Sequence, residues 1–368
     1  MVFINVPIVR AEELIPNGKS GLLMEVSSGK ILFEKNKDER LAVASMTKMM
    51  GLIIIMEKLE SKEISLDDVI TVSKNAAGMG GSQIYLSSGE EMTIRDLIKG
   101  ITMASANDAT VAMAEKIAGS EEKFVELMNL KVKELGLKNT HFVNSTGLDE
   151  ENHYSSSYDM SLIAKELLMY ESILDFTSVY EDYLRVDTSN KFWLVNTNKL
   201  VRLYEGADGL KTGFTDAAGY CMAVTAKRNG MRLLAVVLGE ESGKVRNSEV
   251  SELLDYGFDN YKTIILKNKN EVIDTIILEK GSKRETNIYL KEDASILMKQ
   301  SDNENGYDTE ISINDISLPL KKNDVVGKFY IKKDNNIVDT IDLIIKEDLY
   351  SKKIYELFFD LLKNTLYI

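Results

Sequence analysis

The most apolar stretch of the chain follows a serine. Met, Leu and Ile dominate residues 46–59, where Gly51 is the only glycine and proline is absent. Apolar side chains that recur without a helix breaker are typical of a buried helix. We therefore predict a helix that Ser45 caps or that begins just before it.

Four further segments carry helical spacing or helix-start signals. One helix is expected to begin at Thr93, whose hydroxyl can cap it, and the others are expected over residues 107–118, 121–135 and 158–170. The stretch 75–89 is rich in glycine and serine. We interpret that stretch as a loop or the edge of a cleft, because helices follow it at once.

Strand patterns lie on both sides of these helices. Residues 20–36 form two short runs around Ser27-Ser28-Gly29-Lys30, which predicts a hairpin. Residues 206–239 form a meander of strand-like runs with a turn at Arg228-Asn229-Gly230, and Asn-Gly is a strong hairpin signal.

The composition changes after residue 261. Residues 262–345 alternate apolar and polar positions in short runs separated by polar turns, which predicts a small all-β domain without catalytic residues. The last segment, 346–368, is expected to form an amphipathic helix. Its apolar face would contain Ile354, Leu357, Phe358, Leu361 and Leu362. Such a helix could lie in a membrane interface or dock on the β domain.

Charge and rare residues exclude several functions. The net charge of -13 argues against binding nucleic acid. Cys221 is the only cysteine, so no internal disulfide and no thiolate metal cluster is expected. With only His141 and His153, a histidine metal site and a Ser-His-Asp triad are both disfavoured.

The N-terminus resembles part of a secretory signal. Residues 1–11 are a short apolar run with a small residue, Ala11, at a possible cleavage point, although the basic leading region is missing. An N-terminal strand is the alternative. No run reaches the roughly 18 apolar residues that a membrane-spanning helix needs.

Ser45 and Lys48 are spaced to share one face of the predicted helix. Helix positions three apart have Cβ atoms roughly 5–6 Å apart, so the hydroxyl and the amine can meet. A neutral lysine can take the hydroxyl proton and make the serine a nucleophile. Neutrality at pH 7 costs about 4.6 kcal/mol unless burial, the helix N-terminus or a second cation lowers the lysine pKa. For this pair alone, a helix cap beside a solvent-reaching lysine is the alternative.

Two more groups could complete a site. Ser105 and Asn107 lie at a break between predicted helices, where both side chains can turn into a cleft or merely cap the next helix. The same spacing in Ser301-Asp302-Asn303 and Ser312-Ile313-Asn314 falls in polar turn or strand sequence, and we interpret both as coincidental.

Lys211-Thr212-Gly213 lies on the first strand of the predicted meander. Lys211 can hold a carboxylate, Thr212 can hydrogen-bond it, and Gly213 lets a substrate backbone lie close along the strand. Lys211 could also be the second cation near Lys48. Taken alone, the tripeptide is more simply an edge lysine beside an ordinary strand glycine.

Together, these motifs resemble the set found in penicillin-recognising serine enzymes: Ser45-Met46-Thr47-Lys48, Ser105-Ala106-Asn107 and Lys211-Thr212-Gly213, in that order. Four stretches sharpen the likeness to D-alanyl-D-alanine carboxypeptidases of the low-molecular-mass penicillin-binding group, namely residues 81–86, 119–129, 140–148 and 196–200. The resemblance implies an α+β, β-lactamase/transpeptidase-like fold. In it, a mainly antiparallel sheet is flanked by helices, and a cleft separates the sheet edge from a helical lobe.

The resemblance also implies a role for each motif residue. Ser45 would be the acylated nucleophile and Lys48 its proton acceptor. Ser105 would relay protons toward the leaving amine, and Asn107 would hold the substrate amide. The implied reaction removes the terminal D-alanine of a peptidoglycan stem pentapeptide, and β-lactams such as penicillins would acylate the same serine. No metal or organic cofactor is expected.

The third motif would bind the end of the substrate. Lys211 and Thr212 would bind its terminal carboxylate beside Gly213, and the N–H groups of Phe214 and of the nucleophile would form the oxyanion hole. Arg246 sits where family members often carry a basic residue near this carboxylate. A surface helix start is the equal alternative for Arg246.

Two other functions are alternatives. A β-lactamase would use a glutamate-positioned water, for which Glu150 and Glu151 lie in a candidate loop, but the sequence around them looks like the carboxypeptidase version. A sensor that binds penicillin or peptidoglycan without turnover need not keep all three motifs. The expected parts are therefore a signal remnant (1–11), a penicillin-binding domain (12–261), a β-rich domain (262–345) and a membrane-associating helix (346–368). Such a protein would act outside the cell, on the outer face of the cytoplasmic membrane.

Overall fold

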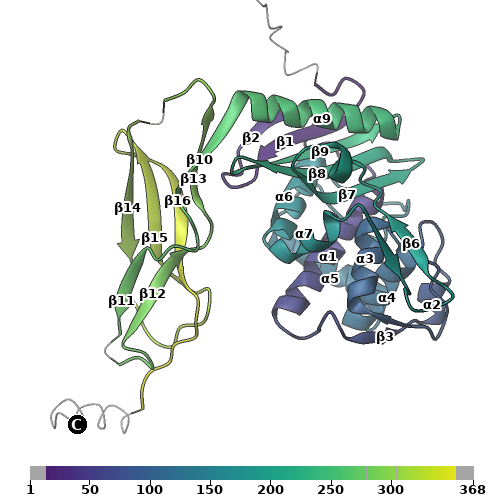
Figure 1. The fold of residues 1–368 in the computed structure, drawn as a ribbon, viewed down its shortest axis with the longest axis horizontal. Coiled ribbons are helices and arrows are strands. Elements are labelled where there is room, and N and C mark those ends of the chain that lie inside the picture. The colour runs from purple at the N-terminus through teal and green to yellow at the C-terminus, as the bar shows by residue number, and fades with distance from the viewer. Residues whose placement is uncertain (1–13, 279, 304, 354–368) are drawn as a thin grey trace, which may run out of the picture. The chain divides into compact units, whose positions relative to one another are not determined.

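The chain divides into two compact units in the computed structural model, which describes residues 14–278, 280–303 and 305–353 (Figure 1). Unit 1 is Met1–Asn260 and unit 2 is Tyr261–Ile368. The predicted signal remnant (1–11) and the apolar face of the predicted tail helix lie outside the described residues. The predicted start of that helix is wrong, because residues 346–353 are not helical: Leu349 forms a bridge with Leu320, and Ser351 forms one with Gly281. Across the described ranges, no helix is both long and apolar enough to cross a membrane.

Unit 1 is built on a five-stranded antiparallel sheet of order β2-β1-β9-β8-β7. Its strands are β1 (Ser20–Glu25), β2 (Ile31–Lys35), β7 (Ala207–Thr215), β8 (Gly219–Arg228) and β9 (Met231–Glu240). The predicted hairpin and meander are therefore confirmed. Asn229 and Gly230 take the left-handed conformation, with φ of 49° and 84°, that a tight Asn-Gly hairpin turn requires.

Helices cover both faces of this sheet. Figure 1 shows the long α9 (Gly243–Asn260) along one face and the other long helices on the opposite side. The latter are α1 (Lys48–Glu60), α3 (Ile94–Met103), α4 (Asn107–Ala118), α5 (Glu121–Glu134) and α6 (Ser157–Leu168). The shorter helices of unit 1 are α2 (Lys74–Ala77), α7 (Leu174–Thr177) and α8 (Leu200–Leu203), and its 3-10 turns are η2 (Ala44–Thr47) and η3 (Glu171–Ile173). Two small antiparallel strand pairs complete the unit: β3 (Val69–Thr71) with β4 (Glu91–Thr93), and β5 (Glu181–Leu184) with β6 (Phe192–Val195).

Local sequence explains where several helices begin. The Thr93 hydroxyl accepts a hydrogen bond from the Asp96 N–H, as predicted for a helix cap. The helix expected over 158–170 begins slightly earlier, because the Ser156 hydroxyl accepts from the Asp159 N–H. Ser45 does not cap the α-helix. It lies inside the 3-10 turn η2, which begins just before it, and the α-helix starts only at Lys48.

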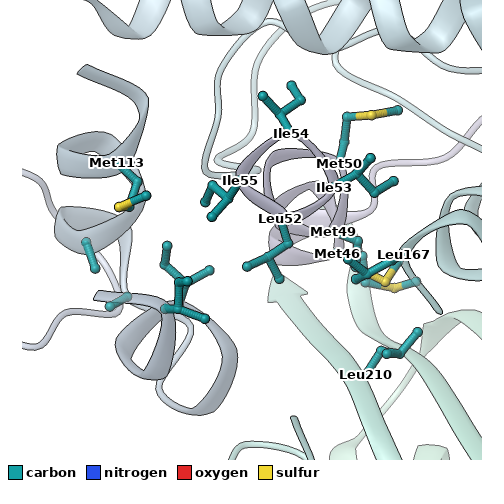
Figure 2. Close-up of a cluster of buried hydrophobic side chains, with 14 of the residues drawn as sticks. Met46, Met49, Met50, Leu52, Ile53, Ile54, Ile55, Met113, Leu167 and Leu210 are labelled. Carbon is teal, nitrogen blue, oxygen red and sulfur yellow. The ribbon is translucent and has the colours of Figure 1, made fainter. Parts of the chain in front are cut away.

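Helix α1 forms the centre of the core. Its apolar residues are buried all round, which explains why its sequence lacks a polar stripe. Figure 2 shows its side chains among neighbours that include Met113 of α4, Leu167 of α6 and Leu210 of β7. This packing holds the N-terminal end of α1, and therefore Lys48, rigidly against the sheet.

Unit 2 is all-β, as predicted. A five-stranded antiparallel sheet has the order β11-β12-β16-β15-β14, and β10 pairs with β13. The strands are β10 (Tyr261–Lys267), β11 (Asp274–Ile277), β12 (Glu285–Leu290), β13 (Ala294–Lys299), β14 (Tyr307–Ile313), β15 (Val325–Lys333) and β16 (Asn336–Ile345). Alternating side chains, among them Ile288, Phe329 and Leu343, form its hydrophobic core.

Candidate active site

The Ser45 turn packs against the free edge of the sheet. β7 hydrogen-bonds to β8 on one side only, and its other edge faces η2. A Cβ added to Gly213 would lie 2.7 Å from the Val43 carbonyl oxygen and 3.1 Å from the Ser45 nitrogen. Only glycine permits this approach, so Gly213 brings the third motif against the first.

The Lys48 amine makes three polar contacts in the site. Its Nζ lies 2.8 Å from Ser45 Oγ, 2.7 Å from Asn107 Oδ1 and 2.6 Å from the Thr146 carbonyl oxygen. The amide oxygen and the carbonyl can only accept, so they take the two N–H bonds of a neutral amine. In the neutral form, the lone pair of the amine would then face Ser45 Oγ, whereas in the charged form the amine donates to that oxygen. The geometry suits a lysine that accepts the serine proton.

The surroundings of Lys48 lower the pKa of its amine. The Lys48 side chain is fully buried, and that burial lowers its pKa well below the usual lysine range. The positive charge of Lys211 lowers it further, whereas the Asp108 carboxylate acts in the opposite direction. Burial and the second cation thus act in the direction anticipated from the sequence.

Asn107 is fixed from two sides. Its N–H donates to the Ser82 carbonyl and its Nδ2 donates to the Gly80 carbonyl, both at 2.7 Å. Because Nδ2 is a donor there, Oδ1 must be the atom that faces Lys48. Buried Asp108 anchors the same loop by accepting from the N–H groups of Ile84 and Leu86.

Ser105 lies between α3 and α4 and is not a helix cap. Its φ of 61° is left-handed, a conformation that non-glycine residues adopt mainly at functional or strained sites. The hydroxyl is buried, and within the described residues it has no hydrogen-bond partner. An unpaired buried hydroxyl is costly, and a bound substrate could supply its missing partner.

The third motif supplies positive charge. Lys211 is 1% exposed, and burial together with the Arg246 charge lowers its pKa to about 7. Its Nζ donates to the Thr212 carbonyl, and the Thr212 hydroxyl donates to Thr197 Oγ1. In contrast, the neighbouring Phe214 is half exposed, and its ring centroid lies 4.3 Å from that of Tyr220.

Arg246 does lie at the start of a helix, in the first turn of α9, but it is 6% exposed, so the predicted alternative of a surface position is wrong. Its guanidinium donates to the Cys221 carbonyl and to Oδ1 of the next residue on the helix, Asn247. Burial lowers its pKa. Lys211 and Arg246 are thus two buried basic groups. The Arg246 charge disfavours the charged form of Lys211, and the Glu240 carboxylate acts on the pKa of Arg246 in the direction opposite to burial.

The loop around Thr146 and Gly147 closes the site, and its contacts with Lys48 and the Ser45 turn were not predicted from the sequence, although residues 140–148 carry part of the family likeness. The Thr146 carbonyl accepts from Lys48, and a Cβ on Gly147 would lie 1.9 Å from the Ala44 carbonyl oxygen. Gly147 also has a φ of 85°, so only glycine fits there. Contacts made by main-chain atoms depend on no particular side chain, so the glycine is the only trace of them in the sequence.

Rival chemistries find less support in the described part of the chain. Glu150 and Glu151, considered for a β-lactamase, are both exposed. Within the described ranges, no group of three or more His, Cys, Asp or Glu side chains could hold a metal ion. A cavity of about 760 Å³ is lined by Met56, Met103 and Phe176 among others, and it contains none of the motif residues.

Known proteins share both units. Residues 9–242 match the peptidase S11 family, described as D-alanyl-D-alanine carboxypeptidase, and residues 261–351 match the C-terminal domain of penicillin-binding protein 5. The D-alanyl-D-alanine carboxypeptidase DacF of Bacillus subtilis is 49% identical over 92% of this chain and 88% of its own length. DacC of Escherichia coli is 33% identical over 90% of this chain and 84% of its own length.

Solved structures agree. Penicillin-binding protein 5 of Haemophilus influenzae superposes with a TM-score of 0.70 at 30% identity, covering 91% of this chain and 98% of that one. Penicillin-binding protein D2 of Listeria monocytogenes, in its ampicillin-bound form, gives a TM-score of 0.59 at 30% identity over 66% of this chain and 98% of that one. The chain therefore belongs to the D-alanyl-D-alanine carboxypeptidase family of serine peptidases.

Proposed function

We propose that this protein removes the terminal D-alanine from peptidoglycan stem peptides through an acyl-enzyme on Ser45, and that β-lactams acylate the same serine. The observation that carries the proposal is the position of the Lys48 amine. It is buried, has a lowered pKa, and lies 2.8 Å from Ser45 Oγ. A base so placed can take the hydroxyl proton as the oxygen attacks.

The reaction has two halves. In the first, Ser45 Oγ bonds to the carbonyl carbon between the last two D-alanines while its proton moves to Lys48 Nζ. The bond to the terminal D-alanine then breaks, and its amine receives the proton by way of the Ser105 hydroxyl. In the second half, water attacks the ester, the bond to Ser45 breaks, and the serine regains its proton.

The remaining residues hold the substrate. Lys211 and Arg246 attract its terminal carboxylate, with the Thr212 hydroxyl beside them, and Asn107 orients its amide. The substrate backbone runs along the free edge of β7 as an added strand. The N–H groups of Phe214 and of the nucleophile stabilise the oxyanion, and one such donor commonly contributes about 3–4 kcal/mol.

Two measurements test the proposal. The full chain is mixed with penicillin and followed by intact mass, and D-alanine release from a peptide ending in D-Ala-D-Ala is measured in parallel. We expect a single long-lived adduct and D-alanine release, both lost in Ser45→Ala. Ser27→Ala is the matched control, because Ser27 and Lys30 have the same spacing but lie in a turn whose serine hydroxyls donate to Glu25.

Other results would contradict it. An adduct that disappears within seconds would indicate a β-lactamase. A stable adduct without D-alanine release would indicate a sensor. An adduct formed equally by Ser45→Ala would show that the nucleophile lies elsewhere.

We further propose that the protein works on the outer face of the cytoplasmic membrane, held there by the part of the predicted tail segment that follows Lys353. The helical spacing of apolar residues in that segment and the cell-wall substrate of the proposed reaction support this location. Since residues up to Ser351 pair with the rest of unit 2, the chain is best truncated after Lys353. The truncated protein should no longer sediment with phosphatidylglycerol–phosphatidylethanolamine vesicles, and unchanged sedimentation would refute the anchor.

A further inference from the structure

A buried histidine connects the nucleophile turn to the loop that closes the site. His153 is 7% exposed, and its Nε2 lies 2.8 Å from Thr47 Oγ1, inside the first motif. Its Nδ1 lies 3.1 Å from the main-chain nitrogen of Val143. One imidazole therefore joins two segments about a hundred residues apart in sequence.

These contacts determine the tautomer. The Val143 N–H can only donate, so Nδ1 must carry the lone pair and the ring proton must lie on Nε2. The Nε2–H then donates to Thr47 Oγ1. A protonated ring would have no acceptor for Val143, so the bridge requires the neutral form.

The bridge leads directly to Lys48. Asn144, the residue after Val143, accepts from the N–H groups of Thr146 and Gly147 through Oδ1. The turn from Val143 to Gly147 is thus stiff, and it carries the Thr146 carbonyl that accepts from Lys48 Nζ at 2.6 Å.

We propose that His153 is a positioning residue for acylation: by tying Thr47 to Val143, it holds the Thr146 carbonyl against Lys48 and so aims the amine at Ser45. This inference rests on the proposed function, because it gives the histidine a part in the same acylation step. His153 touches neither the reacting atoms nor the carboxylate site.

The surroundings of His153 favour its neutral form. Burial, followed by the positive charge of His141, lowers its pKa to about 4, and Lys48 acts in the same direction. Asp149 is the charge that opposes them. The bridge is therefore intact at neutral pH and is lost as the pH falls toward 4.

Two substitutions cut the bridge at different ends. His153→Asn keeps an acceptor near the Nδ1 position but loses the donor to Thr47. His153→Gln keeps a donor near the Nε2 position but loses the acceptor for Val143. We expect each to slow acylation by penicillin about 10- to 100-fold, because small displacements of a catalytic group have effects of that size. Thr47→Val should add little to His153→Asn, since both remove the same hydrogen bond.

A pH profile separates positioning from mere loss of folding. Loss of the Thr146 carbonyl should lower the Lys48 pKa, so the acidic limb of the acylation rate should move to lower pH. His141→Asn is the control, because His141 is the exposed histidine of the same loop. This variant should change neither the acylation rate nor the position of its acidic limb. Two results would overturn the inference. One is that the His153 variants are acylated at the wild-type rate. The other is that their rate falls only in proportion to the folded fraction while the acidic limb stays at the same pH. Failure of wild type to be acylated at all would instead refute the proposed function.

Discussion

The two units differ in what they bury. Unit 1 encloses ionisable side chains throughout its interior: Glu25, Lys48, Asp108, His153, Asp159, Lys211, Glu240, Arg246 and Glu249. In the described part of unit 2, the buried polar residues are Thr286 and Ser295, and the core is otherwise hydrophobic. Both units have well-formed antiparallel sheets, so sheet formation does not explain the difference.

Burying charge is costly, and proteins accept that cost mainly where function needs it. Lys48 and Lys211 illustrate the point, because burying an apolar side chain at either position would cost less free energy. The pKa of each lysine is lowered. The buried charges that unit 1 needs for its chemistry therefore lower its stability. The described core of unit 2 contains no such charges, so its residues serve stability alone. The contrast can be tested by substitutions in both units.

The largest effect is expected for Lys48→Met, which removes the base but keeps most of the side-chain volume. Acylation by a fluorescent penicillin should slow about 10²- to 10⁴-fold, the usual contribution of a general base. Lys58→Met is the matched control, because Lys58 lies on the same helix and pairs with Glu63 at the surface. If the acylation rate of Lys48→Met stayed within twofold of wild type, the buried charge of unit 1 would not serve the chemistry, and the contrast between the units would lose its basis.

Gly147→Ala should have the next largest effect. The new Cβ would lie 1.9 Å from the Ala44 carbonyl oxygen, so the loop must move away from Lys48. We expect acylation to slow about 100-fold. Gly136→Ala is the control, since Gly136 also has a positive φ, 66°, but nothing lies within 4 Å of its Cβ position. Equal effects of the two substitutions would show that backbone strain alone is responsible.

The pH dependence of substrate capture should follow Lys211. Its pKa of about 7 means that the cation is present below that pH and is lost as the pH rises. The acylation efficiency at low penicillin concentration should therefore fall above pH 7, by up to about tenfold per pH unit. Lys211→Arg keeps its charge and should flatten this alkaline limb. An unchanged limb in that variant would assign the titration to another group.

The smallest effect on chemistry is expected in unit 2. Ile288→Ala creates a cavity in its core and should lower the stability of that unit by about 2–5 kcal/mol, measured as a lower melting transition. Acylation should not change. Ile277→Ala, at an exposed position of β11, should alter neither property by much. Slower acylation by Ile288→Ala would mean that unit 2 takes part in the chemistry.

Much of the fold could be predicted from local sequence. The helix expected over residues 107–118 has those limits in the structure, and the Asn229-Gly230 turn and the Thr93 cap are found as predicted. Such features depend on neighbouring residues, whose side chains contain the signal. The all-β character of unit 2 followed from alternation for the same reason.

The candidate site could be predicted only in part. The sequence alone singled out Ser45, Lys48 and Lys211, because a nucleophile, a base and a cation must be side chains of particular types. It left open whether Ser45 caps the helix or lies just inside its start, where the structure has a 3-10 turn. It also gave no role to His153, whose partners include a residue distant in sequence.

What the sequence determined by itself is the set of chemical groups and the local elements that carry them. Only the tertiary structure decided that the Thr146 carbonyl reaches Lys48, that the backbone beside Ser45 lies against Gly147 and Gly213, and that His153 bridges two segments. The physical reason is that these contacts involve main-chain atoms or long-range partners. A carbonyl is present in every residue, so its position becomes informative only when the chain is folded.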